Sequence, residues 1–289
     1  LSLVSPLSPI SITLSAYWLP HSVSLLSDAL ESLFNLITAI VALIALSIAA
    51  RPADEEYAFG YSKVEFFSSG FEGGMILIAA GSIAVTAIPR LISPQPIEQV
   101  GLGLAVSAAA SLINLGAARV LASAGKRYDS ITLQADSHHL MTDVFTTGGV
   151  LVGVGLVSLT GWQRLDPLIA LLVAANILRT GIGLVKQAGL GLMDASLPAS
   201  DIHVIQEILQ PYDAQGIKFH ALRTRSAAAR GFVSMHILLP GAWTVERSHR
   251  IAEQIENQIR ARFPRLSIFT HVEPIEDPTA LEDGSLDLI

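Results

Sequence analysis

Two long apolar stretches of the sequence carry ionisable and amide side chains at helical spacing. In the first, Asp28, Glu31 and Asn35 stand at positions i, i+3 and i+7, so an α-helix would place them on one stripe. In the second, His139 and Asp143 are four positions apart and would also share a helix face. Charged side chains are costly at membrane depth, so such groups indicate a functional site by default.

Oxygen and nitrogen donors that converge from two helices are suited to binding a metal ion. Four of them match the tetrahedral shell of Zn²⁺, and Fe²⁺, Mn²⁺ and Co²⁺ accept related geometries. The alternative is a hydrogen-bond and charge network that only holds the helices together. Two such groups in separate stretches favour the metal site, whereas Glu72, Asn114 and Asn176 stand singly and are predicted to serve packing.

A second group of metal-binding residue types lies near the C-terminus. Four of the eight histidines of the chain fall within one small region, together with a glutamate: His220, His236, His249, His271 and Glu273. On a β-strand, residues two positions apart share a face, as His271 and Glu273 would. A binuclear site at a dimer contact is one interpretation, and scattered surface histidines are the other.

Composition places these residues in a membrane protein with two parts. Hydrophobic residues make up 51% of the chain and charged residues only 15%, and most of the charge follows Asp194. The net charge of -7 and an acidic C-terminal segment argue against nucleic-acid binding. Because the chain has no cysteine, any metal must be held by histidine, carboxylate or amide groups. We predict a membrane domain at residues 1–190, a second domain at 198–275 and a flexible acidic tail at 276–289.

Six stretches approach the roughly 20 apolar residues that a helix needs to cross a bilayer. They are residues 1–18, 22–50, 64–92, 97–122, 138–160 and 168–188. Basic residues gather beside the second and fourth connections, which places these connections and the C-terminal domain in the cytoplasm. The chain begins without Met and without a signal-peptide pattern, so we expect that the natural chain starts earlier and that its first stretch stays in the membrane.

The pattern changes after residue 198 to helix, strand, strand, helix, strand. We predict helices at residues 201–209 and 244–263, the second capped by Thr244, and strands at 216–225, 231–239 and 266–273. A domain of about 80 residues has a modest core, so dimerisation through it is expected.

With these residues in hand, the chain resembles the cation diffusion facilitator family of metal and proton antiporters. Three segments match in order and spacing: Ser-Asp-Ala-Leu-Glu-Ser-Leu-Phe-Asn, Arg-Pro-Ala-Asp-Glu-Glu-Tyr-Ala-Phe-Gly-Tyr-Ser-Lys-Val-Glu and Ala-Asp-Ser-His-His-Leu-Met-Thr-Asp. The likeness covers nearly the whole chain. It implies a six-helix transmembrane bundle followed by a cytoplasmic ferredoxin-like αββαβ domain, which together form a homodimer.

The resemblance also implies roles for individual residues. It assigns the transport site to Glu31, Asn35, His139 and Asp143, and leaves Asp28 one turn away as a support or proton path. It places a cytoplasmic metal cluster at the C-terminal histidines and Glu273 already named. It further implies a charge pair between the membrane and cytoplasmic halves, formed by Lys63 and Asp194.

Two departures from the family pattern concern metal binding. Zinc transporters of the family usually have Asp or His where Glu31 stands and Asp where Asn35 stands, so this site carries one fewer negative charge. The loop after the second span often holds a metal site of one Asp and two His. Here Asp54 is kept but Tyr57 and Tyr61 take the histidine positions, so we expect that loop site to be absent.

The sequence therefore predicts a transporter and not an enzyme. It would exchange a divalent metal ion for protons by alternating access in the bacterial inner membrane, with Zn²⁺ first and Fe²⁺, Mn²⁺, Co²⁺, Cd²⁺ or Ni²⁺ as other substrates. One alternative is a membrane-anchored metal sensor or chaperone whose spans do not transport, although an anchor alone gives no reason for buried ionisable stripes. The other is an intramembrane hydrolase, which lacks a His-Glu-x-x-His motif here.

Overall fold

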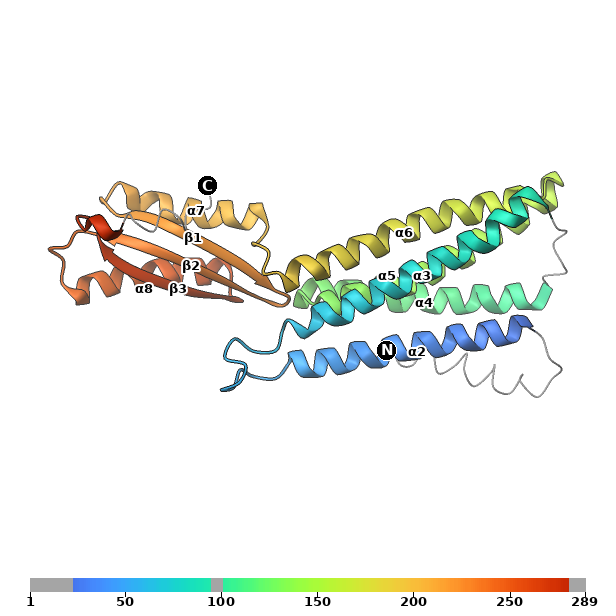
Figure 1. Ribbon diagram of the computed structural model, residues 1–289, viewed down its shortest axis with the longest axis horizontal. Helices are drawn as coiled ribbons and strands as arrows, with labels where there is room; N and C mark the ends of the chain where they lie inside the picture. Colours follow the sequence, from blue (N-terminus) through green and yellow to red (C-terminus); the bar gives the residue numbers. More distant parts are fainter. Residues whose placement is uncertain (1–22, 95–100, 281–289) are drawn as a thin grey trace. The chain divides into compact units, whose positions relative to one another are not determined.

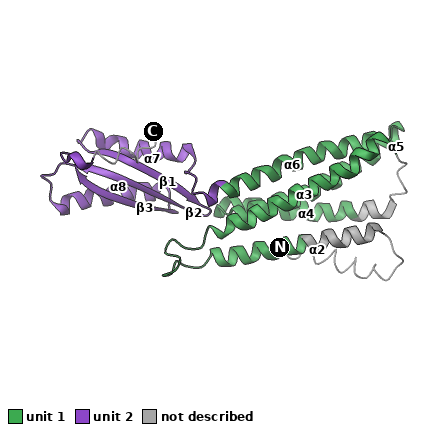
Figure 2. Cartoon of the chain, in the orientation of Figure 1, with its two compact units in different colours: residues 1–189 green, residues 190–289 purple. Residues whose placement is uncertain are grey.

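The computed structural model describes residues 23–94 and 101–280, with only the helical backbone described for residues 23–34 and 101–106. The first predicted span, residues 1–18, lies outside the described residues. The chain divides into two compact units, residues 1–189 and 190–289, drawn in two colours in Figure 2.

The first unit consists of long helices (Figure 1). In chain order they are α2 (Val23–Ala49), α3 (Val64–Ile92), α4 (Gly101–Tyr128), α5 (Ile131–Thr160) and α6 (Leu165–Leu192). Among the described residues, four stretches are long and apolar enough to cross a bilayer: α3, α5, α6 and Ser107–Tyr128 of α4. The described part of α2, Asn35–Ala49, is a shorter apolar helix.

The connection between α4 and α5 is tighter than the predicted gap between residues 122 and 138. The backbone turns at Asp129, which has a φ of 50°, and the Ser130 side chain then accepts the Leu133 N–H as the cap of α5. Ile131 and Ala135 are buried in the first turns of α5. Both helix ends were therefore misplaced, because hydropathy reports the apolar stretch while capping and packing set the helix end.

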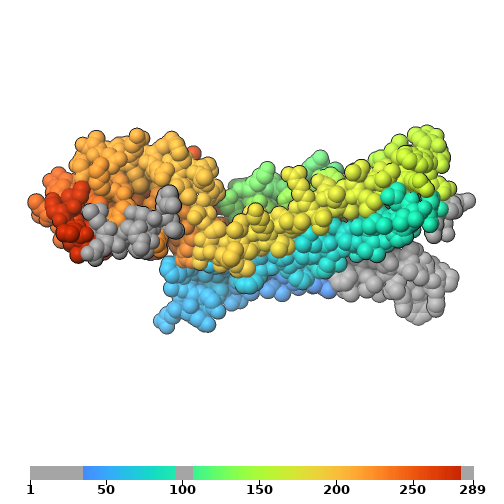
Figure 3. Space-filling model, turned by 45° about the horizontal axis from the view of Figure 1, so that its top comes forward, coloured from blue at the N-terminus to red at the C-terminus, as the bar shows by residue number. Residues whose placement is uncertain are grey.

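Glycines let the helices of this unit pack closely. At Gly73 on α3, a Cβ atom would lie 3.0 Å from the Leu184 side chain of α6, and α3 and α6 lie side by side in Figure 3. On α5, a Cβ at Gly149 would lie 2.8 Å from Val173, and one at Gly153 would lie 2.7 Å from Asp166. A helix–helix core of Ile76, Ala80, Ala135, Ile177 and Leu184 follows from this close approach.

The second unit is an α+β domain with a three-stranded sheet. Its elements are α7 (Ala199–Asp213), β1 (Lys218–Ala227), β2 (Arg230–Leu239), α8 (Val245–Arg262) and β3 (Leu266–Pro274). The strand order is β1-β2-β3, with β1 antiparallel and β3 parallel to β2. As predicted, Thr244 caps α8, accepting the Arg247 N–H. Helix α7 continues beyond the predicted residue 209 because Tyr212, 3% exposed, anchors its last turn in the core.

Both helices pack on one face of this sheet. Alternate residues of β2, among them Val233, Met235 and Ile237, join side chains of α7 and α8 such as Ile205 and Ile255 in one buried core. Strand alternation therefore turns the other residues of β2, including the histidine at position 236, toward the opposite face.

The first part of the predicted acidic tail is held against this domain. Glu276 accepts the Gly241 N–H at 2.8 Å, and Asp277 accepts hydrogen bonds from the N–H and hydroxyl of Thr279. These bonds lower the pKa of the Asp277 carboxyl. Residues 281–289 lie outside the described residues.

Candidate metal sites

Three of the four residues assigned to the transport site meet in the helical unit. Asn35 of α2 lies between His139 and Asp143 of α5. Its Oδ1 is 2.9 Å from the His139 Nε2, and its Nδ2 donates to the Asp143 Oδ2 at 3.4 Å. All three side chains are half-buried. The side chains of Glu31 and Asp28 lie outside the described residues, so their assignments stay predictions.

The spacing on α5 explains why these donors converge. His139 and Asp143 are one turn apart, so both face α2, while the adjacent His138 is exposed. The hydroxyls of Thr142 and Thr146 bond to backbone carbonyls of their own helix, at residues 138 and 143. These hydroxyls therefore leave the amide, imidazole and carboxylate as the groups that face one another.

The same arrangement has the chemistry of a site for a divalent cation. An amide oxygen, an imidazole nitrogen and a carboxylate oxygen from two helices lie within hydrogen-bonding reach of one another. Each of these atoms is a ligand type for Zn²⁺ and its neighbours in the transition series.

Sequence reasoning missed a buried carboxylate at the start of α3. Glu65, 3% exposed, accepts a hydrogen bond from the Ser130 hydroxyl and another from the Thr132 N–H at 3.3 Å. The Thr132 hydroxyl in turn donates to the Glu65 carbonyl at 3.4 Å. A carboxylate at a helix N-terminus is favoured by the unpaired N–H groups and the helix dipole. Glu65 therefore ties the start of α5, the helix of His139, to α3.

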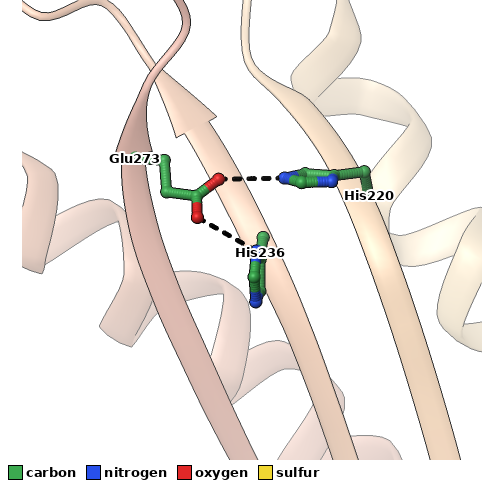
Figure 4. Close-up of side chains that lie close together, drawn as sticks. All are labelled: His220, His236 and Glu273. Carbon is green, nitrogen blue, oxygen red and sulfur yellow. Dashed lines mark hydrogen bonds and ion pairs between the residues drawn. The ribbon is translucent and has the colours of Figure 1, made fainter. Parts of the chain in front are cut away.

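A second candidate site lies on the sheet of the α+β unit (Figure 4). The Glu273 carboxylate points between two imidazoles, with Oε2 3.0 Å from the His220 Nε2 and Oε1 3.1 Å from the His236 Nδ1. The three side chains are 10–18% exposed, and one ligand atom from each lies within 4.8 Å of the others. Among the side chains that the structure describes, this is the one group of three histidine, aspartate or glutamate residues close enough to hold a metal ion.

Strand register brings these residues together from distant parts of the sequence. His220 pairs with His236 across the antiparallel β1–β2 ladder, and His236 pairs with His271 across the parallel β2–β3 ladder. The register shifts directly after His220, where Ala221 is 3% exposed and has a φ of 51°. Such a bulge redirects the side chains beside it.

The other two residues predicted for this cluster lie at its edge. His271 is 3.4 Å from the Glu273 Oε1 through its Nε2, but its side chain is 67% exposed. His249 is exposed on α8 and lines the same hollow as Glu273, without a contact to the cluster among those described. Both positions are therefore open to solvent or to a partner surface.

The loop between α2 and α3 is organised by a carboxylate–phenol contact. The Asp54 carboxylate accepts the Tyr61 hydroxyl at 2.5 Å and the Tyr57 N–H at 2.8 Å, and the two tyrosine rings lie 4.5 Å apart. These bonds lower the pKa of Asp54, and the Asp54 contact raises the pKa of Tyr61 to about 12. The carboxylate of Asp54, which would be the metal ligand of this loop, is thus already hydrogen-bonded to the two tyrosines.

The predicted pair of Lys63 and Asp194 joins residues of different units and stays a prediction. Within its own unit, Asp194 accepts a hydrogen bond from Arg225 at 3.2 Å and has a φ of 57°. Lys63 is the residue that precedes the first turn of α3.

Known proteins resemble this chain over most of its length. Residues 1–193 match the cation efflux transmembrane domain, and residues 197–275 match the cytoplasmic domain of cation efflux proteins. The chain is 50% identical over 278 residues to an uncharacterized transporter of Synechocystis sp., a match that covers 96% of this chain and 90% of that protein. It is 30% identical over 274 residues to the cation-efflux pump FieF of Klebsiella pneumoniae, covering 94% and 90%. The FieF pump of Salmonella arizonae is 29% identical, with 91% and 87% covered. The chain therefore belongs to the cation diffusion facilitator family, whose members are membrane transporters that carry divalent cations out of the cytoplasm.

Proposed function

We propose that this transporter exports Zn²⁺ in exchange for protons, by alternating access, through a site formed by Glu31, Asn35, His139 and Asp143. The observation that carries the proposal is the convergence of the Asn35 amide, the His139 imidazole and the Asp143 carboxylate between α2 and α5. Glu31 lies one turn before Asn35 on α2 and would complete a four-ligand shell. Asp28, one turn further, would support the ligands or carry protons.

The donor set favours Zn²⁺ without excluding its neighbours. Two carboxylates, one imidazole and one amide oxygen suit a small tetrahedral ion, and the chain has no thiolate to offer a softer metal. The neutral amide at position 35 lowers the charge of the site, which leaves Fe²⁺, Mn²⁺, Co²⁺, Cd²⁺ and Ni²⁺ as competing substrates.

Proton exchange follows from the same ligands. An imidazole or a carboxylate binds a metal ion only after it has lost its proton, so metal and protons compete for His139 and the carboxylates. A site that is reached alternately from each side would then move the two in opposite directions. No bond of a substrate is made or broken, so we assign no catalytic residue.

The remaining architecture of the proposal follows the family pattern. Residues 1–18 would supply a first span, which makes a six-helix bundle with α2–α6, and the α7–β3 domain would be ferredoxin-like. We infer a homodimer in a bacterial inner membrane, with the cytoplasmic cluster of His220, His236, His271 and Glu273 as a second metal site near the dimer contact and with His249 beside it. The Lys63–Asp194 pair would link the two halves of each chain.

A second candidate function is a metal sensor or chaperone anchored by its spans. The observation in its favour is that His220, His236 and Glu273 are already assembled. In that case metal binding would depend on the cytoplasmic cluster alone. The half-buried donors of α2 and α5 would then have no role, which is why we prefer transport.

Transport into liposomes distinguishes the two functions. We expect purified protein to drive Zn²⁺ flux that increases with an opposing proton gradient, and Asp143→Ala or His139→Ala to abolish it. His138→Ala is the matched control, since this exposed neighbour faces away from the site and its loss should leave transport intact. If Asp143→Ala transports Zn²⁺ at the wild-type rate, the assignment of the site is wrong. If the wild type itself shows no metal flux, the sensor function is favoured.

A further inference from the structure

A carboxylate on α3 is less exposed than Asn35, His139 and Asp143, the described residues of the transport site. Glu72 is 0% exposed and lies in the first third of α3, a helix long and apolar enough to cross a bilayer. Its Oε1 accepts a long hydrogen bond from the Ser68 hydroxyl at 3.5 Å, and its Oε2 has no hydrogen-bond partner among the described residues. A buried charged oxygen without a hydrogen-bond partner is unfavourable because nothing replaces the water that it has lost, so this arrangement disfavours an ionised Glu72.

Among the described residues, the groups identified around Glu72 do not supply a compensating positive charge. Asp136 of α5, 4% exposed, is near enough that a charge on it acts on Glu72. The buried described positions of α2 are Thr38 and three alanines, and α6 presents Leu184 and Val185 where it meets Gly73. Two carboxyl groups whose charges interact in an apolar interior do not both ionise readily, because like charges there repel strongly.

A resident metal ion is a poor explanation for this pair. The one three-residue group with metal-binding geometry in the described part of the chain is the cytoplasmic cluster, and Glu72 is not part of it. Two carboxylates without a third ligand hold a transition metal weakly. A proton needs only one oxygen, and the partnerless Oε2 offers it.

The pair is placed where it would sense the charge of a transported ion. Asp136 precedes His139 by three residues on α5, and the charges of these two side chains interact. Asp136 therefore interacts by charge both with Glu72 and with His139 of the transport site. An ion carrying two positive charges at His139 would offset the repulsion between the two carboxylates and so favour the state in which both are ionised.

We propose that Glu72 is a proton-binding residue of the transport cycle, distinct from the metal ligands, which holds a proton on its carboxylate while the site is empty and releases it to water when a metal ion occupies the site. The inference rests on the proposed exchange of metal for protons. The proton leaves as the metal arrives, so total charge in the bilayer changes less than it would with the ion alone.

Counting protons tests this role directly. Zn²⁺ is titrated into purified full-length protein in weakly buffered detergent with a pH indicator, for the wild type, Glu72→Gln and the loop control Glu56→Gln, which is exposed. We expect the number of protons released per Zn²⁺ to fall by about one in Glu72→Gln and to stay unchanged in Glu56→Gln. The wild type and Glu72→Gln should bind zinc equally well at acidic pH, where Glu72 stays protonated. As the pH rises, the wild type should gain affinity over the variant by up to about tenfold per pH unit.

Glu72→Asp keeps a carboxyl group and should restore the lost proton, which a purely structural role of Glu72 would not require. An infrared difference spectrum of the unmodified protein on adding Zn²⁺ adds a measurement that needs no stable Gln variant. We expect loss of a protonated-carboxyl band that shifts in Glu72→Asp.

The outcomes separate this inference from the proposed function. If the wild type releases protons and Glu72→Gln releases equally many, with the same pH dependence of affinity, Glu72 is not a proton site. An infrared spectrum without a carboxyl band sensitive to position 72 leads to the same conclusion. If the wild type itself binds zinc without releasing protons, metal–proton exchange fails first, whatever the variant does.

Discussion

Replacing Asn35 by aspartate adds one negative charge to the transport site without changing its shape. In the present arrangement the Asn35 Nδ2 donates to the Asp143 Oδ2 at 3.4 Å. In Asn35→Asp a carboxylate oxygen takes the place of that donor, so two acceptor oxygens face each other at this distance. Two unit charges 3.4 Å apart repel by about 5 kcal/mol at an effective dielectric constant near 20.

This repulsion sets the size of the expected effect on metal binding. A divalent cation between the two carboxylates converts it into attraction, and about 1.4 kcal/mol corresponds to a factor of ten in affinity. The full value would be an increase of roughly three to four orders of magnitude, but the empty site will relieve its repulsion by taking up a proton. We therefore expect Zn²⁺ to bind about 10–100-fold more tightly at pH 8, with the gain shrinking as the pH falls.

Calorimetric titration of Zn²⁺ and Mn²⁺ between pH 6 and about 8 measures both quantities. Asn114→Asp is the matched control, because it makes the same chemical change on α4, which carries no predicted ligand. Affinities for both metals that stay unchanged in Asn35→Asp, with an unchanged pH dependence, would show that Asn35 does not contact the ion. A gain of the same size in Asn114→Asp would show that net charge alone is responsible.

Three further predictions concern the elements that hold the site. Ser130→Ala removes both the cap of α5 and the hydroxyl that Glu65 accepts, so thermal unfolding should reveal a loss of about 1–2 kcal/mol, with Ser158→Ala, whose hydroxyl bonds only within its own helix, as control. Gly153→Val forces a side chain against Asp166 and should lower the melting temperature more than the same change at Gly155, which has open space. Tyr61→Phe should speed amide exchange in residues 54–61, and equal exchange in both proteins would refute the role of the Asp54–Tyr61 bond. In the wild type the lowered pKa of Asp54 means that the loop's protection is present above the usual titration range of an aspartate and is lost below that range, as the pH falls through the lowered pKa. The raised pKa of Tyr61 means that protection is lost again as the pH rises through about 12.

Spacing along a helix predicted which polar side chains of α2 and α5 meet, because the information is local. Asn35, His139 and Asp143 lie where the helical repeat places them, and the cost of polar groups in a bilayer leaves few other roles for them. The apolar stretch that became α3 matches the predicted residues 64–92 because both of its ends are marked by polar residues.

Contacts between distant segments were beyond such reasoning. The bond between Glu65 and Ser130 depends on where α5 begins, and hydropathy placed that start seven residues too late. The charge interaction between Glu72 and Asp136 likewise depends on how α3 and α5 are rotated relative to each other, which the sequence of either helix does not specify. In the sheet, residue types predicted a histidine cluster, but the bulge at Ala221 that follows His220 has no signal in an alanine.

Because the histidines form a row across the sheet, the positions of the metal ligands depend directly on the register of the strands. His220, His236 and His271 occupy matching positions on three adjacent strands, and a slip of β3 by a single residue would turn both His271 and Glu273 to the opposite face. An ion bound there would stabilise the pairing of β3 with β2, because β3 could not detach from the sheet without breaking its bonds to the ion. The cytoplasmic zinc concentration would then set how often β3 detaches from the sheet. Amide hydrogen exchange rates measure this opening separately for each strand.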